Sequence, residues 1–119
     1  MLHKELDVWK KTIDLVTDIY KITKGFPDEE KFTLTSQLRR SAISIPSNIA
    51  EGAGRRSDKE FIQFLYIALG SAAETETQLI IASNINYLKE DAPVFLKIEN
   101  VRKMILGLIK SLKGKDHEK

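Results

Sequence analysis

Two groups of basic residues carry the side chains of this sequence that are best suited to binding a ligand. Arg39 and Arg40 are adjacent in a segment of helical character. A second group follows the same segment and consists of Arg55, Arg56 and Lys59. Because an arginine presents a planar fork of N–H donors that matches phosphate oxygens, both groups are candidate nucleic-acid contacts.

Each basic group also has a structural interpretation. For Arg39 and Arg40 this is ion pairing with acidic residues, inside the bundle or between subunits, and the sequence favours it because adjacent helical residues point in different directions. The candidate partners are Glu51, Glu74 and Glu76. For Arg55, Arg56 and Lys59 a solvated charged corner and a nucleic-acid footprint remain equally open.

The same helical segment carries a seam of small and polar residues on one side and an apolar face on the other. The seam residues recur at steps of four, three, four and three, and they are Gln37, Ser41, Ser44, Asn48 and Glu51. A later run of small residues, with Gly70, Ser71 and nearby Glu74, matches it in character. Short side chains let helices approach closely, so these eight residues are predicted to pack between helices or between subunits.

No group of residues in this sequence has the types and spacing of a catalytic or metal site. The chain has no cysteine, and His3 and His117 lie near its ends. Asn48 with Glu51 is a poor ligand pair, so hydrogen bonding between helices is the favoured interpretation. We therefore expect no enzymatic activity, no metal and no cofactor.

Composition and charge describe a small protein of ordinary character. The chain has 119 residues and a net charge of +2, which is too small to indicate nucleic-acid binding by itself. The segment from Lys97 to Lys119 is nonetheless rich in basic residues. We expect a cytoplasmic protein, because no signal peptide precedes the first helix and no apolar run approaches the ~20 residues that span a bilayer.

Hydrophobic periodicity predicts four helices. The first is expected from Glu5 to Lys24, with an inward stripe of Leu6, Trp9, Ile13, Val16 and Tyr20 and a left-handed cap at Gly25. The second begins at Asp28 or Thr33 and ends at Ala53. Its apolar spacing stays in phase across Pro46, which favours one helix bent at Pro46 over two helices broken at Ile45.

The third and fourth helices are also predicted from local signals. A capping box at Ser57–Glu60 begins the third, which is expected over Asp58–Tyr87 and is apolar nearly all round. Asp91 is predicted to cap the fourth, with Pro93 in its first turn, and Gly114 is predicted to end it. Its inward positions form a heptad pattern of Val94, Ile98, Val101, Ile105, Leu108 and Leu112.

Four helices with short connections and no strand signal predict an all-α fold. The expected architecture is an antiparallel up-down-up-down four-helix bundle. Residues 1–119 form a single domain by length, ordered over about 5–113, with a charged tail at 114–119.

Two sequence blocks resemble a known family. They are Gln37–Ser41 with Ser44–Gly52, and Phe61–Ser71 with Glu74. The chain resembles the four-helix bundle proteins encoded in intervening sequences of bacterial 23S ribosomal RNA genes, which are also described as ribosomal-protein-like. It is more distantly similar to accessory proteins of diversity-generating retroelements. The resemblance implies a homo-oligomer, often a ring of about five subunits, that binds RNA or DNA and has no enzymatic function.

Two hypotheses follow for the function. In the first, the protein is an oligomeric nucleic-acid-binding scaffold that uses the basic groups. In the second, it is a protein–protein interaction module without a nucleic-acid role. Both predict self-association, because a helix that is apolar nearly all round needs cover on most sides.

Overall fold

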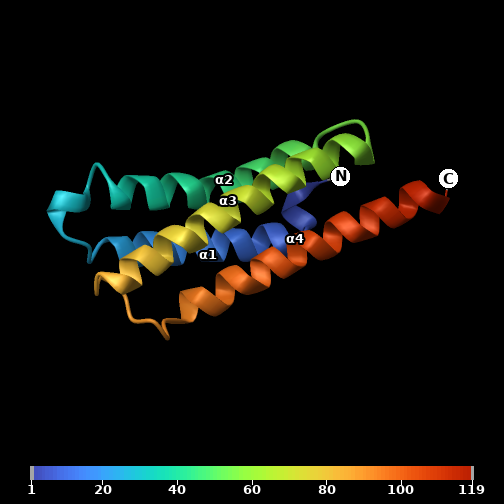
Figure 1. The fold of residues 1–119 in the computed structure, drawn as a ribbon. Coiled ribbons are helices and arrows are strands. Elements are labelled where there is room, and N and C mark those ends of the chain that lie inside the picture. Colours follow the sequence, from blue (N-terminus) through green and yellow to red (C-terminus); the bar gives the residue numbers. More distant parts are fainter. Residues whose placement is uncertain (1, 119) are drawn as a thin grey trace.

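The computed structural model describes residues 2–118, except for the side chains of residues 115–118, and shows an all-α protein, as predicted. A 3₁₀ turn, η1 (His3–Glu5), precedes α1 (Asp7–Thr23), and a second 3₁₀ turn, η2 (Asp28–Glu30), precedes α2 (Leu34–Ala53). Then come α3 (Asp58–Asn84) and α4 (Pro93–Glu118) (Figure 1). No strand occurs in this range.

The four helices form an elongated bundle of 52 × 24 × 20 Å. Figure 1 shows the chain reversing direction at each connection, with the ends of α2 and α4 at the same end of the molecule. Helix α1 packs against α2 and α4, and α3 packs against the same two helices. Each helix therefore has two neighbours, and the core lies between them.

The start of α2 follows the later of the two predicted positions. Asp28–Glu30 forms the separate turn η2, and α2 begins at Leu34. Pro46 lies inside α2, which is continuous from Leu34 to Ala53, so the alternative of two helices broken at Ile45 is wrong. The bend at Pro46 stays a prediction.

Three predicted helix ends are wrong. Among the described glycines none has a positive φ, so Gly25 is not a left-handed cap; its N–H instead bonds the Ile22 carbonyl in a 3₁₀-type turn. Helix α3 ends at Asn84 rather than Tyr87, because Asn86 takes the left-handed conformation, with φ 66°. Helix α4 continues past Gly114 to Glu118, since a glycine lowers helix propensity but keeps its backbone donor and acceptor.

The buried face of α1 is rotated from the predicted stripe. Ile13 is exposed, and Trp9, Val16 and Tyr20 are only half-buried. The fully covered positions are Val8, Thr12, Leu15, Ile19 and Thr23. The two threonines fit in this core because their hydroxyls donate to the carbonyls of Trp9 and Ile19, at 2.6 and 2.8 Å.

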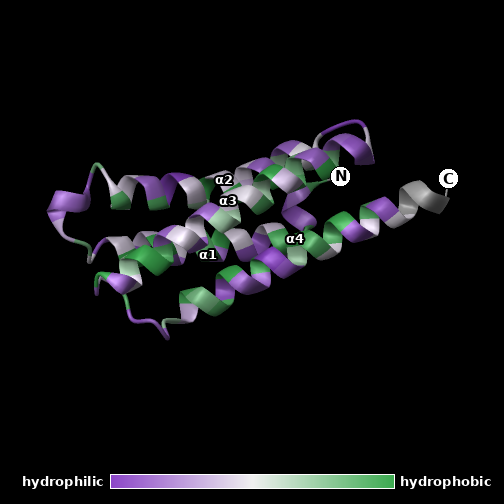
Figure 2. Ribbon diagram, viewed as in Figure 1, coloured by the Kyte–Doolittle hydropathy of each residue, from purple (hydrophilic) through white to green (hydrophobic). Residues whose placement is uncertain are grey.

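Helices α3 and α4 differ in how completely their apolar residues are covered. In α4 the predicted heptad is buried except for Leu108, which is half-buried while its neighbour Ile109 is buried. In α3 several large apolar side chains stay exposed, and Figure 2 shows green, hydrophobic turns along its length. We call these exposed residues the α3 ridge: Tyr66, Ile67, Ile80, Ile81 and Ile85.

Candidate nucleic-acid interface

Arg39 is held at the C-terminal end of α1. Its Nε donates to the Thr23 hydroxyl at 2.8 Å, and Nη2 donates to the Tyr20 carbonyl at 3.4 Å. The guanidinium carbon lies 4.5 Å from the centroid of the Tyr20 ring. The negative end of the α1 helix dipole also stabilises a cation at this position. Arg39 therefore joins α1 to α2, a role that neither sequence interpretation anticipated.

Arg40, the next residue, is exposed. No ion pair in the described part of the chain involves Arg39 or Arg40, so pairing inside the bundle is not found. Pairing between subunits stays a prediction. Both arginines line an open groove of about 510 Å³ between the end of α1 and the start of α2, together with Lys31 and Phe32.

Arg55, Arg56 and Lys59 lie together at the corner between α2 and α3, and all three are exposed. Arg55 bonds Glu51 at 3.0 Å, one helical turn away, and its guanidinium carbon lies 4.7 Å from the Phe64 ring centroid. Ser57 caps α3 by accepting the Glu60 N–H at 3.2 Å, which confirms the capping box and fixes the corner.

Helix α4 brings a further cation to the same end of the bundle. Lys113 is exposed and its Nζ donates to the Tyr66 hydroxyl at 2.8 Å, which places the end of α4 beside the first part of α3. We call Arg55, Arg56, Lys59 and Lys113 the corner patch. The sequence showed the basic character of the last helix but did not indicate that Lys113 lies on the α3 side.

The two basic groups are not brought together by the fold. Arg39 and Arg55 are separated along α2 by roughly 24 Å at 1.5 Å of helix rise per residue. Lys97, another basic residue of α4, forms an ion pair with Asp18 of α1, and this hydrogen bond raises the pKa of Lys97. The molecule thus presents two separate basic regions.

The middle of the polar seam of α2, at Ser41 and Ser44, faces α3 of the same chain. Ser41 is buried; its Oγ donates to Gln78 Oε1 and accepts from Thr75 Oγ1, each at 2.8 Å. Ser44 Oγ and Ser71 Oγ are 2.8 Å apart. Asn48 Nδ2 donates to the Ser44 carbonyl and hydroxyl, at 2.8 and 2.9 Å. Ser41, Ser44 and Ser71 therefore bond between helices, whereas Asn48 bonds within α2.

The other four predicted packing residues have no such role within the chain. Gln37, Glu51, Gly70 and Glu74 are exposed, and a Cβ at Gly70 would meet nothing within 4 Å. The close approach occurs at Gly52, where a Cβ would lie 2.7 Å from Phe64 Cβ and 2.9 Å from Phe61 Cδ1. Gly52 was not among the packing residues predicted from the sequence.

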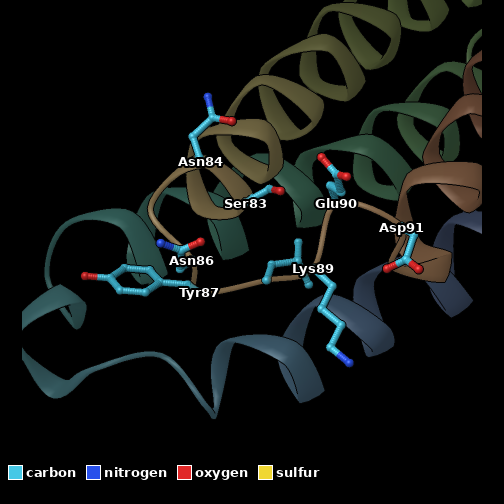
Figure 3. Close-up of a pocket in the computed structure, with 8 residues that line it drawn as sticks. Ser83, Asn84, Asn86, Tyr87, Lys89, Glu90 and Asp91 are labelled. Carbon is cyan, nitrogen blue, oxygen red and sulfur yellow. The ribbon is translucent and has the colours of Figure 1, made fainter.

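A hollow of about 570 Å³ lies at the α3–α4 connection and has mainly polar walls. Figure 3 shows Asn84, Lys89 and Asp91 pointing in different directions, so they do not converge on a ligand. Tyr87 in the same view extends toward the α1–α2 connection, where its hydroxyl donates to Glu30 at 2.9 Å. Hydrogen bonds from the hydroxyls of Thr33, which has the larger effect, and of Tyr87 lower the pKa of Glu30.

Neither a metal site nor a membrane-spanning helix is found in the described residues. No cluster of three or more His, Cys, Asp or Glu side chains is arranged to hold a metal ion within that range. None of the helices described there has the length and apolar content needed to cross a bilayer.

Comparison with known proteins adds a family and a structural relative. The model of the 23S rRNA-intervening sequence protein family matches residues 4–107. A crystal structure from Bacteroides thetaiotaomicron, of a protein with unknown function from the S23 ribosomal protein family, is 28% identical with a TM-score of 0.81. The similarity covers 92% of this chain and 99% of that one. A search of curated proteins found no match. Neither description names a reaction.

Proposed function

This chain belongs to the 23S rRNA-intervening sequence protein family, and from that premise we propose that it is a non-enzymatic, oligomeric scaffold that binds RNA or DNA. The observation that carries the proposal is the corner patch. Four exposed cations from the α2–α3 corner and from α4 gather at one end of the bundle. Such a cluster suits contacts to successive phosphates.

The corner patch has three acidic neighbours, Glu51, Asp58 and Glu60, and two of them are engaged in bonds. Glu51 is paired with Arg55, and Glu60 accepts a hydrogen bond from the Ser57 hydroxyl at 3.3 Å. Arg55 also stacks over Phe64, which limits the directions its guanidinium can take. A partly ordered arginine loses less rotamer freedom on binding a phosphate than a free one.

Self-association is supported by the α3 ridge rather than by the polar seam. Ser41 and Ser44 of the seam already bond to α3 of the same chain, whereas the ridge leaves four isoleucines and a tyrosine about half exposed along α3. Several large apolar side chains exposed along one helix are a candidate interaction surface. We propose that further copies cover it, in a closed assembly such as the ring of about five subunits that the family resemblance implies.

Filter binding of a structured RNA over a salt series tests the nucleic-acid part. Phosphate contacts release counterions, so affinity should fall steeply with salt. Replacing Arg55, Arg56 and Lys59 together by Gln should reduce the log–log salt slope by about 2 to 3. A matched control replaces the exposed Lys10, Lys11 and Lys21 of α1 by Gln and should leave the slope nearly unchanged. Absence of binding at ~50 mM salt would contradict the proposal.

Light scattering tests the assembly. Ile80→Glu together with Ile81→Glu places charge on the ridge and should shift the particle toward the monomer mass of 13.5 kDa. Leu96→Glu alters an exposed leucine of α4 outside the ridge and is the control. A wild-type particle of monomer mass at micromolar concentration would overturn self-association.

The α3 ridge also supports a second candidate function, a protein–protein interaction module without a nucleic-acid role. This candidate predicts an oligomer that fails to bind RNA or DNA even at low salt. The scaffold function requires both salt-dependent nucleic-acid binding and an oligomer, whereas the interaction module requires only the oligomer. The two measurements above therefore separate the candidates.

A further inference from the structure

Phe32 is the most exposed large apolar side chain in the described residues, at 85%. It lies between η2 and the start of α2, where the backbone bonds Lys31 to Asp28 and Thr33 to Glu30. The residue is therefore held by an ordered connection while its ring faces solvent. A phenylalanine gains free energy by leaving water, so this ring is available to a ligand or a partner that would cover it.

The surroundings of Phe32 are cationic. The Nζ of Lys31 lies 5.6 Å from the ring centroid, and Arg39 and Arg40 line the same groove of about 510 Å³. Tyr20 and Ile43 supply apolar wall, and Thr35 and Ser36 supply hydroxyl groups. Among the described residues that line the groove, none is acidic.

The acidic residues that precede Phe32 in the chain are not among the residues that line the groove. Glu30 stays ionised, because hydrogen bonds from the hydroxyls of Thr33 and Tyr87 lower its pKa. Asp28 and Glu29 are exposed on η2 and are not among the lining residues. An exposed ring bordered by cations matches the two parts of a nucleotide, the flat base and the anionic phosphate.

We infer that this groove binds an unpaired segment of nucleic acid, with a base stacked on Phe32 and the flanking phosphates at Lys31 and Arg40. Arg39 contributes charge from a fixed position, since its bonds to Thr23 and Tyr20 use two of its five N–H donors. The inference rests on the proposed function and specifies its ligand. Bases in a duplex are stacked on one another, so a ring can reach only those that are unpaired.

The two basic regions then have different tasks. The corner patch consists of exposed charges that suit any phosphate backbone, and its binding should be insensitive to strand type. The Phe32 groove adds an aromatic face and should discriminate single strands from duplexes. Because the two regions lie at opposite ends of α2, substitutions in one should leave the other intact.

The first experiment compares Phe32→Ala with wild type on a 12-nucleotide single-stranded RNA and on a blunt 12-base-pair RNA duplex at fixed salt. Affinity for the single strand should fall about 5- to 100-fold, since stacking on an aromatic contributes that range, while affinity for the duplex should not change. Phe32→Tyr keeps the aromatic face and should retain single-strand affinity. Leu96→Ala truncates another exposed apolar side chain, away from the groove, and is the matched control.

A second variant detects the stacked base directly. Phe32→Trp in a Trp9→Phe background places the chain's single tryptophan in the groove. Its fluorescence should be quenched by the single strand and not by the duplex. Quenching by neither would overturn the inference even if Phe32→Ala weakened binding through a change in folding.

The remaining outcomes are distinct. If wild type binds no nucleic acid, both the proposed function and this inference are wrong. If wild type binds and Phe32→Ala binds the single strand equally well, only the inference is wrong. If Phe32→Ala lowers the particle mass in light scattering and leaves single-strand affinity per subunit unchanged, a second copy covers the ring and the groove is an interface.

Discussion

Helix α3 meets its two neighbours in different ways. Toward α2 the contact is close and partly polar: Gly52 lets the Phe61 and Phe64 side chains approach the α2 backbone, and Ser41, Thr75 and Gln78 bond across the interface. The α4 contribution to the core is aliphatic, with Ile98, Val101 and Ile105 among its buried residues. The first interface depends on shape and partner placement, and the second on apolar volume.

This difference bears on self-association. A seam of small and polar residues suggested a second subunit, but α3 of the same chain supplies partners to Ser41 and Ser44. No buried side-chain nitrogen or oxygen within the described residues lacks a hydrogen-bond partner. The largest group of exposed apolar side chains along one helix is the α3 ridge. An oligomer is therefore expected to form through apolar burial at the ridge.

The largest loss of stability is expected for a buried aliphatic residue of α4. Ile105 is fully buried, so Ile105→Ala should lower the free energy of unfolding by about 3 kcal/mol through lost burial and a residual cavity. Chemical denaturation measures the change. Leu106→Ala, at the exposed neighbouring position, should cost less than about 1 kcal/mol, and similar losses for both variants would contradict the assigned α4 face.

The next largest effect is expected at the close approach. Gly52→Ala would place a Cβ 2.7 Å from Phe64 Cβ, which can move only with its backbone, and should destabilise the protein by about 2 kcal/mol. Gly70→Ala is the matched control on α3, where a Cβ meets nothing within 4 Å. There alanine should stabilise the helix by up to about 1 kcal/mol in the monomer. Shifts of opposite sign in the unfolding temperatures of the two variants would support the assigned contact at Gly52. Shifts of the same sign would contradict it.

The polar bonds across α2 and α3 should contribute a smaller amount. Ser41→Ala removes the bonds to Gln78 and Thr75 and should cost about 1 to 2 kcal/mol, while Ser47→Ala at an exposed site of the same helix should cost less than half of that. Gln78→Leu combined with Ser41→Ala should cost less than the sum of the single changes. Additive losses would show that the two side chains act independently.

The smallest effect on stability is expected for the contact between Glu30, in the α1–α2 connection, and Tyr87, in the α3–α4 connection. Bonds from Thr33 and Tyr87 lower the pKa of Glu30, so the ionised carboxylate stabilises the folded state above its ordinary pKa. That stability is lost as the pH falls through the lowered folded-state value. Tyr87→Phe should therefore show a shallower loss of stability than wild type between about pH 6 and pH 3.

Tyr66→Phe is the control for the pH measurement. It also removes a tyrosine hydroxyl, but one whose partner is Lys113 rather than a carboxylate. Its stability difference from wild type should stay constant over the same acid range. Parallel pH curves for wild type and Tyr87→Phe would show that the Glu30 contact does not stabilise the protein in solution.

Parts of the candidate site could be predicted from the sequence and parts could not. The α3 cap at Ser57 and the α4 heptad depend on residues close in sequence, and both were predicted with only Leu108 misplaced. The role of Arg39 could not be predicted, because its partners Thr23 and Tyr20 lie on another helix. Phe32 and Lys113 were missed for the same reason, since exposure and spatial neighbours are not local properties.

The sequence by itself determined that this chain forms four helices, where most of them begin and which family it resembles. Capping residues and apolar periodicity act within a few turns, so these features can be identified without a fold. Only the tertiary structure decided that Ser41 and Ser44 of the polar seam bond to α3 of the same chain, that the ridge of α3 is left uncovered, and that the basic residues form two separate regions. Those outcomes depend on how each helix is rotated about its axis, and packing between helices sets that rotation.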